Sequence, residues 1–214
     1  MKPQPDQCSD QGTLPIVLGV SGASAQQLAE RSLQLLLEHQ RHVHLIFSRG
    51  AHEVWNAELE VHVPVEPEAQ AAFWRERLRC HHGVLECHRW NDQAASIASG
   101  SVRTRGMVIV PCSMGSVGRI AAGVATDLLE RVADVHLKEG RPLVLAPREM
   151  PWNLIHLRNL TTLAEAGARI APPIPAWYTQ PKTLDDMVDF LVVRLFDSLG
   201  ENLKPIQRWR SPQP

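Results

Sequence analysis

The sequence predicts a three-layer α/β domain in which helices cover both faces of a doubly wound parallel sheet. Four apolar runs are continuous rather than alternating, as expected of strands that are buried on both faces. Segments with helical spacing separate these runs, and strands that alternate with helices form parallel βαβ units. The predicted strands are Leu14–Val20, Val43–Phe47, Met107–Val110 and Pro142–Ala146.

Helices are predicted from periodicity and from signals at their ends. Leu33, Leu36 and Leu37 have the i, i+3, i+4 spacing of a stripe that faces a core. Pro151 suits the first position of a helix, and Gly167 lies where the C-terminal cap of that helix is expected. The segments predicted as helices after the first are Glu66–Leu78, Pro151–Ala166 and Leu184–Leu199.

Composition and charge are those of one globular domain. The chain has 214 residues, of which 44% are hydrophobic and 21% charged, and its formal net charge is −1. Such a charge indicates neither nucleic acid nor an anionic membrane as a partner. No apolar run approaches the roughly 18–20 residues of a spanning helix, and the start of the chain lacks signal-peptide features, so we expect a cytoplasmic protein. The expected organisation is a disordered leader over residues 1–12, a single domain over residues 13–203 and a C-terminal arm over residues 204–214 with Trp209 as its candidate anchor.

Small and hydroxyl-bearing residues follow the predicted strands. In open α/β sheets ligands bind beyond the carboxyl ends of the strands, where backbone N–H groups and helix starts attract anions. Neither GxGxxG nor GxxxxGK[ST] occurs, so a mononucleotide such as FMN fits better than a dinucleotide or a P-loop nucleotide. The strand-end segments are Gly19–Ser24, Ser48, Pro111–Ser116 and Pro147–Glu149.

Each of these signals also has a purely structural interpretation. Ser24 followed by Gln27 is a capping-box pattern, which needs no ligand. Arg131, Lys138 and Arg148 are equally compatible with solvated charges at helix ends.

Arg194 and Tyr178 stand out for their sequence surroundings. On a helical wheel Arg194 falls inside an apolar arc beside Phe190, where a charge usually has a partner or a ligand. Tyr178 is the only tyrosine, and the stiff segment Pro172–Trp177 precedes it. That segment presents a phenol at a fixed point, or else forms a surface turn with an amphipathic ring.

The segment Cys80–His88 holds two cysteines and three histidines, which could be metal ligands or residues of a surface strand or loop. Zinc pairs are usually separated by two to four residues, and a second clean pair is missing. We therefore favour a surface strand or loop with incidental thiols over a metal site.

Taken together, these residues resemble the flavin prenyltransferase family of the UbiX type, from about Leu14 to about Trp209. The resemblance implies a Rossmann-like (flavodoxin-like) fold and a homo-oligomer, typically a dodecamer, with sites at subunit interfaces. It also implies a metal-independent transfer of a dimethylallyl group from dimethylallyl phosphate, or the pyrophosphate, to N5 and C6 of reduced FMN, giving a cofactor for UbiD-type decarboxylases in ubiquinone-type biosynthesis. The most specific segments are Ser99–Ser101, Gly106–Gly115, Ala133–Glu139, Arg141–Leu145, Pro147–Glu149 and Pro172–Tyr178.

The resemblance assigns roles to individual residues. Lys138, Tyr178 and Arg194 match the binders of the prenyl phosphate, with Arg131 as a nearby candidate. Glu149 matches a residue that handles protons, and Ser24 and Lys138 are the other catalytic candidates. The residues that match the FMN contacts are Gly22, Ala23, Ser24, Ser48, Ser113, Met114, Gly115, Ser116 and Arg148.

Three positions depart from the family pattern, and two rival functions remain. Ala25 stands where the family commonly has glycine, Ser116 replaces a usual threonine, and Asp127 replaces a common asparagine. The related FMN-dependent cysteine decarboxylases carry a Pro-Ala-Ser-Ala-Asn motif where this chain has Pro111–Gly115. A non-catalytic FMN-binding protein would lack the set that includes Lys138 and Glu149.

Overall fold

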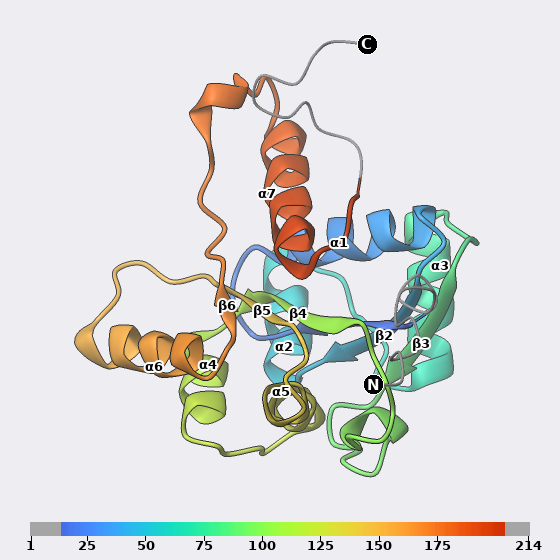
Figure 1. Ribbon diagram of the computed structural model, residues 1–214. Helices are drawn as coiled ribbons and strands as arrows, with labels where there is room; N and C mark the ends of the chain where they lie inside the picture. The colour runs from blue at the N-terminus through green and yellow to red at the C-terminus, as the bar shows by residue number, and fades with distance from the viewer. Residues whose placement is uncertain (1–13, 204–214) are drawn as a thin grey trace, which may run out of the picture.

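The computed structural model describes residues 14–203, and the predicted leader and C-terminal arm, with Trp209, lie outside this range (Figure 1). Its centre is a sheet of six parallel strands in the order β3-β2-β1-β4-β5-β6. The strand order reverses between β1 and β4, so the sheet is doubly wound and Rossmann-like (flavodoxin-like) as predicted. The strands are β1 Ile16–Val20, β2 His42–Phe47, β3 Val84–His88, β4 Gly106–Cys112, β5 Leu143–Pro147 and β6 Arg169–Ile170.

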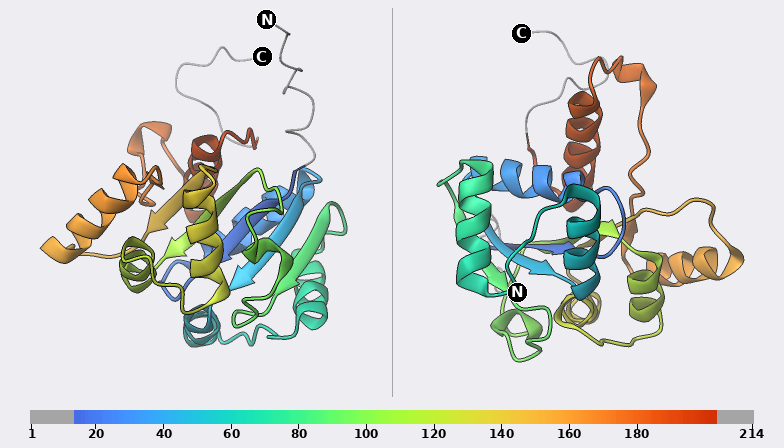
Figure 2. Two further views of the ribbon diagram at one scale, coloured as in Figure 1. Left: turned by 60° about the horizontal axis from the view of Figure 1, so that its bottom comes forward. Right: turned by 180° about the vertical axis from the view of Figure 1, so that it is seen from behind.

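Helices pack against both faces of the sheet (Figure 2). Ile16, Leu18 and Val20 of β1 face one hydrophobic cluster, which also holds buried residues of α1, α2, α3 and α7. Val17 faces the opposite cluster, with residues of α4, α5 and α6. The central strands are buried on both sides for this reason, which explains their continuous apolar sequences. The helices are α1 Gln26–Glu38, α2 Arg49–Leu59, α3 Pro67–Leu78, α4 Met114–Ala121, α5 Leu128–Lys138, α6 Leu154–Glu165 and α7 Leu184–Leu199.

The start of α6 differs from the prediction, and its end agrees with it. α6 begins at Leu154, because the Asn153 side chain accepts a hydrogen bond from His156 N at 2.9 Å and caps the helix. Pro151 therefore precedes the helix instead of occupying its first position. Gly167 does adopt the left-handed conformation expected beyond the C-terminus, with φ 101°.

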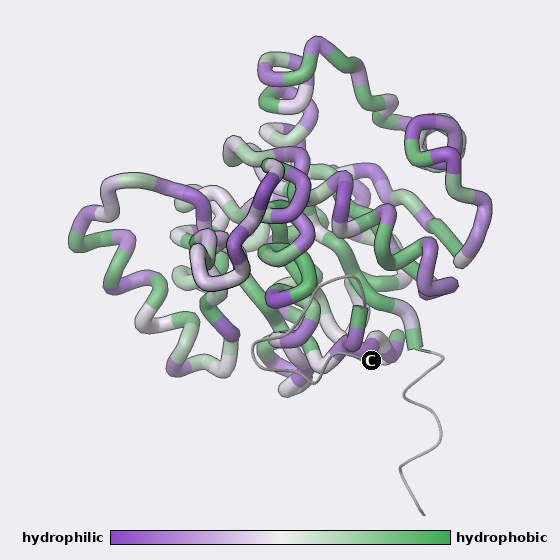
Figure 3. The backbone as a smooth tube through the Cα atoms, turned by 90° about the horizontal axis from the view of Figure 1, so that it is seen from above, coloured by the Kyte–Doolittle hydropathy of each residue, from purple (hydrophilic) through white to green (hydrophobic). Residues whose placement is uncertain are grey.

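Two parts of the molecule project from the sheet. The segment that follows β6 runs outward beside α7, and α6 extends to one side (Figures 1 and 2). Apolar side chains there are exposed: Met150 by 88%, Trp177 by 71% and Leu184 by 74%. The most hydrophobic backbone instead runs through the strands at the centre (Figure 3). Large exposed apolar side chains on projecting segments are typical of contacts with another protein chain.

No helix within residues 14–203 is both long enough and apolar enough to cross a membrane.

Candidate functional site

The loops at the carboxyl ends of four neighbouring strands are joined by hydrogen bonds. Ser48 N, after β2, donates to Val20 O of β1 at 2.9 Å. Ser21, after β1, is fully buried, and its Oγ donates to Pro111 O at 2.9 Å and accepts from Ser113 N at 2.7 Å. Arg148 N, after β5, donates to Cys112 O of β4 at 3.1 Å. The predicted strand-end residues therefore share one edge around the switch point between β1 and β4.

The start of α1 differs from the predicted capping box. The N-cap residue is Ala25, with φ 80° and ψ 43°, and no side chain caps this end. The buried side chain of Gln26 instead donates from Nε2 to Ser21 O at 3.1 Å and to Ala23 O at 2.7 Å. Ser24 is consequently not the helix cap, and its hydroxyl is not committed to that role.

A close approach between two backbones shapes the site beside β1 and β2. A Cβ atom added to Gly22 would lie 2.8 Å from the carbonyl carbon of Gly50 and 2.9 Å from its Cα. Only glycine fits at Gly22, because backbone atoms cannot move aside as a flexible side chain can. Gly50 is not among the residues predicted for the site, and its only local signal in the sequence is its position just after the strand-end Ser48.

Two of the predicted serines cap helices that begin at this edge. Ser48 Oγ accepts from Ala51 N at 3.2 Å at the start of α2, and Ser113 Oγ accepts from Ser116 N at 3.1 Å at the start of α4. Ser116 is buried, and its hydroxyl accepts from Ser113 Oγ at 3.1 Å. The first N–H groups of both helices, including those of Met114 and Gly115, have no intrahelical partner by position. Together with the helix dipoles they form an environment suited to an anion such as the FMN phosphate.

Arg148 supplies a cation at the same edge. Its Nε atom is buried and has no hydrogen-bond partner within residues 14–203. The side chain lines a groove of about 810 Å³ together with Ala25 of the first loop and Pro173 of the projecting segment. A buried guanidinium N–H without a partner is costly, so this donor indicates an anionic or carbonyl-bearing ligand. Next to it, Glu149 is exposed, and its Oε1 accepts from Met150 N at 3.1 Å.

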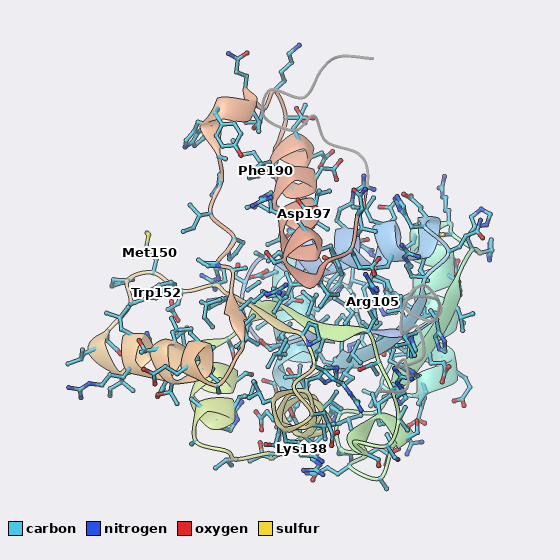
Figure 4. The ribbon with its side chains drawn as sticks, in the orientation of Figure 1. Arg105, Lys138, Met150, Trp152, Phe190 and Asp197 are labelled. Carbon is cyan, nitrogen blue, oxygen red and sulfur yellow. The ribbon has the colours of Figure 1, made fainter. Side chains whose placement is uncertain are left out.

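Lys138 does not join this edge within a single chain. It ends α5, and a helix that follows a strand returns toward the amino ends of the strands. Its Nζ bonds to Glu139 Oε1 at 2.7 Å and lies 2.9 Å from the position of a Cβ added to Gly100, in the loop that precedes β4. Figure 4 shows Lys138 on the far side of the sheet from Phe190 and Asp197. Arg131, also on α5, pairs with Asp134 at 3.0 Å.

Arg194 lies beside Phe190 and Leu191 of α7, as the helical wheel predicted, and it has an acidic partner. Its side chain is 57% exposed and pairs with Asp197 at 3.0 Å. Tyr178 is also exposed, and its ring meets the ring of Phe190 edge-on with centroids 5.9 Å apart. The two residues belong to the projecting part of the chain. The residues of α7 that face the core are Val192, Val193, Leu195, Phe196 and Leu199.

The departure at Asp127 has a structural explanation. Asp127 Oδ1 accepts from Glu130 N at 2.9 Å and caps α5. Burial is the main reason that its pKa is raised, with a further contribution from the charge of Glu130. Aspartate and asparagine are equally good N-caps, so the replacement keeps the cap.

The cysteines are packing residues in this structure. Cys80 and Cys87 are buried in the core cluster beneath α1 and α3. Burial raises the pKa of Cys87 to about 12 and that of Cys112, at the end of β4, to about 12. Both thiols are therefore neutral near pH 7.

Comparisons with known proteins identify relatives that match nearly the whole chain. A family model described as Flavoprotein matches residues 6–196. Flavin prenyltransferase UbiX of Synechocystis sp. is 53% identical over 197 residues, which cover 92% of this chain and 96% of the relative. Its counterpart from Pseudomonas aeruginosa is 42% identical over 194 residues, with coverages of 91% and 93%.

Solved structures show the same relationship. AnUbiX (PadA1) in complex with FMN and dimethylallyl pyrophosphate superposes with a TM-score of 0.81 at 35% identity, covering 94% of this chain and 99% of that chain. A dodecameric FMN-dependent UbiX-like decarboxylase from Escherichia coli O157:H7 superposes with a TM-score of 0.80 at 39% identity, with coverages of 92% and 100%. The FMN-dependent cysteine decarboxylase TvaF, at 15% identity and a TM-score of 0.58, shares only the fold.

Proposed function

This chain belongs to the UbiX-type flavin prenyltransferases of the flavoprotein family, and we propose that it joins a dimethylallyl group to reduced FMN at the carboxyl edge of its sheet. One observation carries this assignment to particular residues: the Nε atom of Arg148 is buried and has no hydrogen-bond partner within residues 14–203, and the side chain lines a groove with the start of α1. Reduced FMN supplies the nucleophilic N5 and C6 positions that receive the prenyl group. The residues of the chain bind both substrates, exclude water and move protons.

The flavin phosphate is assigned to the helix starts. The backbone N–H groups that follow Ser48 and Ser113 donate to phosphate oxygens, because these N–H groups have no partner inside their helices. Gly22 allows the first loop to pack directly on α2, which keeps these donors close together. The guanidinium of Arg148 is assigned to the isoalloxazine ring of the flavin or to the chain that joins this ring to the phosphate. Ser24 offers a hydroxyl group that does not cap α1.

The prenyl phosphate is assigned to cations that one chain does not bring together. Breaking the carbon–oxygen bond of the phosphate ester leaves negative charge on the phosphate, and fixed donors such as Lys138, Arg194 and the Tyr178 phenol stabilise that charge. Arg131 is a further donor on the same helix as Lys138. Glu149 is positioned to take up and return a proton at the strand edge, as ring closure requires loss of a proton from the flavin.

This arrangement requires an oligomer, because Lys138 lies on the opposite side of the sheet from Phe190 and Asp197 of α7, the helix that also carries Arg194 (Figure 4). Two observations support assembly: exposed apolar side chains such as Met150 and Trp177 on the projecting segments, and the dodecameric state of the Escherichia coli relative. The proposal is that neighbouring copies bring the projecting segment with Tyr178 and Arg194 to the flavin edge of another copy. A dodecamer is the expected assembly.

The proposed function also indicates which enzyme uses the product and in which compartment the protein works. The product is a prenylated flavin, which a UbiD-type decarboxylase would consume. We place the enzyme in the cytoplasm, since its three described cysteines are unpaired and unpaired thiols persist in reducing compartments. Residues 13–203 form its single catalytic domain in this proposal.

The direct test is anaerobic incubation of the protein with reduced FMN and dimethylallyl phosphate, followed by mass spectrometry of the flavin. We expect a flavin heavier by one C5 prenyl unit, and the pyrophosphate is tested in parallel. If FMN binds but the flavin mass stays unchanged with both donors, the protein is a non-catalytic FMN-binding protein and the proposal is wrong.

Variants separate the two groups of residues. Arg148→Met is expected to weaken FMN binding, whereas Glu149→Gln and Tyr178→Phe should slow prenyl transfer at least about tenfold while FMN stays bound. Glu58→Gln, an exposed change on α2, is the control and should leave both properties intact. Full activity of Glu149→Gln or Tyr178→Phe would contradict the role given to that residue.

A further inference from the structure

A cluster of histidines and a glutamate lies on the two strands at one end of the sheet, away from the flavin edge. His42 and His44 are two residues apart on β2, so their side chains point to the same face of the sheet. In the parallel register His44 pairs with Glu86 of β3, and Ile46 pairs with His88. Paired residues share a face, so Glu86 and His88 join the two histidines of β2. The proposed prenyl transfer uses none of these four residues.

The potential ligand atoms of this cluster are close together. His42 Nε2 lies 2.6 Å from Glu86 Oε1, and His44 Nδ1 lies 3.8 Å from Glu86 Oε2. One ligand atom from each of His42, His44 and Glu86 can be chosen so that all lie within 4.8 Å of one another. His88 Nε2 lies 2.9 Å from His44 Nδ1. Ligands of tetrahedral zinc sit roughly 2.0–2.2 Å from the ion, which separates neighbouring ligand atoms by about 3.3 Å. The observed separations bracket this value.

The arrangement of the rings in the cluster suits a metal ion. The rings of the cluster lie against one another: the ring centroids of His42 and His44 are 4.9 Å apart, and those of His44 and His88 are 5.1 Å apart. A neutral imidazole offers one nitrogen lone pair to a metal ion. A bound cation would also neutralise the Glu86 carboxylate.

We propose that His42, His44 and Glu86 form a binding site for a first-row divalent transition metal such as Zn²⁺. Two imidazoles and one carboxylate form a borderline nitrogen and oxygen donor set, which favours Zn²⁺ over Mg²⁺ or Ca²⁺. The fourth position is open to water and has His88 beside it. Glu86 is 49% and His42 31% exposed, so an ion can enter from solvent, whereas the nearly buried His44 fixes the inner side of the site. The site joins the edge strand β3 to β2.

Titration of the full-length, chelator-treated protein tests this proposal. Calorimetry with Zn²⁺ should show one ion bound per chain, and Co²⁺ should give the visible absorption of a four-coordinate site. The midpoint of thermal unfolding should rise with Zn²⁺ concentration and return when a chelator is added, because the ion binds the folded chain. No Zn²⁺ binding by the wild-type protein would overturn the proposal.

Variants locate the site. His42→Ala and Glu86→Gln should each weaken Zn²⁺ binding by about tenfold or more. His81→Ala and His82→Ala remove exposed histidines just before β3 and should leave binding unchanged. Bound FMN shows that each variant is folded. Equal loss of binding in the controls, or unchanged binding in both His42→Ala and Glu86→Gln, would refute the site. Prenyl transfer should not depend on the ion, so loss of transfer activity alone would bear on the proposed function and not on this inference.

Discussion

Replacing Arg119 with methionine should destabilise the protein, because a buried carboxylate would lose its cation. The side chain of Glu130 is 0% exposed. It accepts hydrogen bonds from Arg119 Nε, from Thr126 N at 2.8 Å and from Thr126 Oγ1 at 2.7 Å. Removing one partner of a buried ion pair costs roughly 3–5 kcal/mol. Arg119 is itself 43% exposed, so water can replace it in part, and we expect the lower end of the range, about 3 kcal/mol.

Thermal unfolding of the FMN-free protein at a fixed protomer concentration measures this cost. For a chain of this size each kcal/mol lowers the unfolding midpoint by roughly 2–4 °C, so the expected decrease is about 6–12 °C. Arg49→Met is the matched control. Arg49 pairs with Glu53 at the surface, where their side chains are 74% and 64% exposed, and such pairs contribute less than about 1 kcal/mol.

A double variant separates the buried charge from simple loss of packing. Adding Glu130→Gln to Arg119→Met removes the unpaired charge, so the double variant should lose less stability than the two single variants together. The reasoning would be refuted if Arg119→Met lowered the midpoint no more than Arg49→Met does. Strict additivity in the double variant would refute it as well.

Three further predictions follow from the backbone and from a buried histidine. Ala25→Gly should raise the free energy of unfolding by up to about 1 kcal/mol, because φ 80° strains a residue that has a Cβ atom. Ala122→Gly, at a helix end without such strain, is the control and should lower the free energy of unfolding. Equal losses of stability in both variants would contradict the strain at Ala25. Gly22→Ala should impair folding or FMN binding through its contact with the Gly50 backbone, and a normal flavin spectrum with an unchanged midpoint would argue against that contact. Burial lowers the pKa of His136 from 6.5 to about 4, so in the folded protein the ring stays neutral over a range where the unfolded chain takes up a proton. The free energy of unfolding should therefore fall by about 3 kcal/mol on account of this group as the pH falls from 6.5 to 4. The denaturation midpoint of His136→Gln should depend less on pH than that of the wild-type protein, and an equal dependence would contradict the prediction.

The strands were predictable to the extent that they are buried. β1, β2, β4 and β5 lie inside the sheet with both faces covered, so each contains a buried apolar run, which in β2 is interrupted by His44. β3 is an edge strand whose residues are mostly exposed or half-exposed, and its sequence identified it only as a surface strand or loop. β6 has two residues, which is too short for any periodicity to appear.

The site was predictable where chain direction alone determines position. Parallel strands end at one edge, so the residues after β1, β2, β4 and β5 had to lie together, and Ser48, Ser113 and Arg148 do. The helical wheel placed Arg194 beside Phe190 but did not show that its side chain is exposed, because a wheel shows which residues share a face and not which face meets the sheet. Lys138 has the residue type and the order of the family motif, but in one chain α5 places it at the opposite edge.

By itself the sequence determined the α/β class, the cofactor edge and the family, because buried strands, strand-end loops and motif order are all local patterns. Tertiary structure decided which distant residues touch. The hydrogen bonds of Ser21 to the loop after β4, the contact of Gly22 with Gly50 and the meeting of His44 with Glu86 each depend on strand register and on backbone separation. Register and separation are set when all the layers pack together, so no local stretch of sequence contains them.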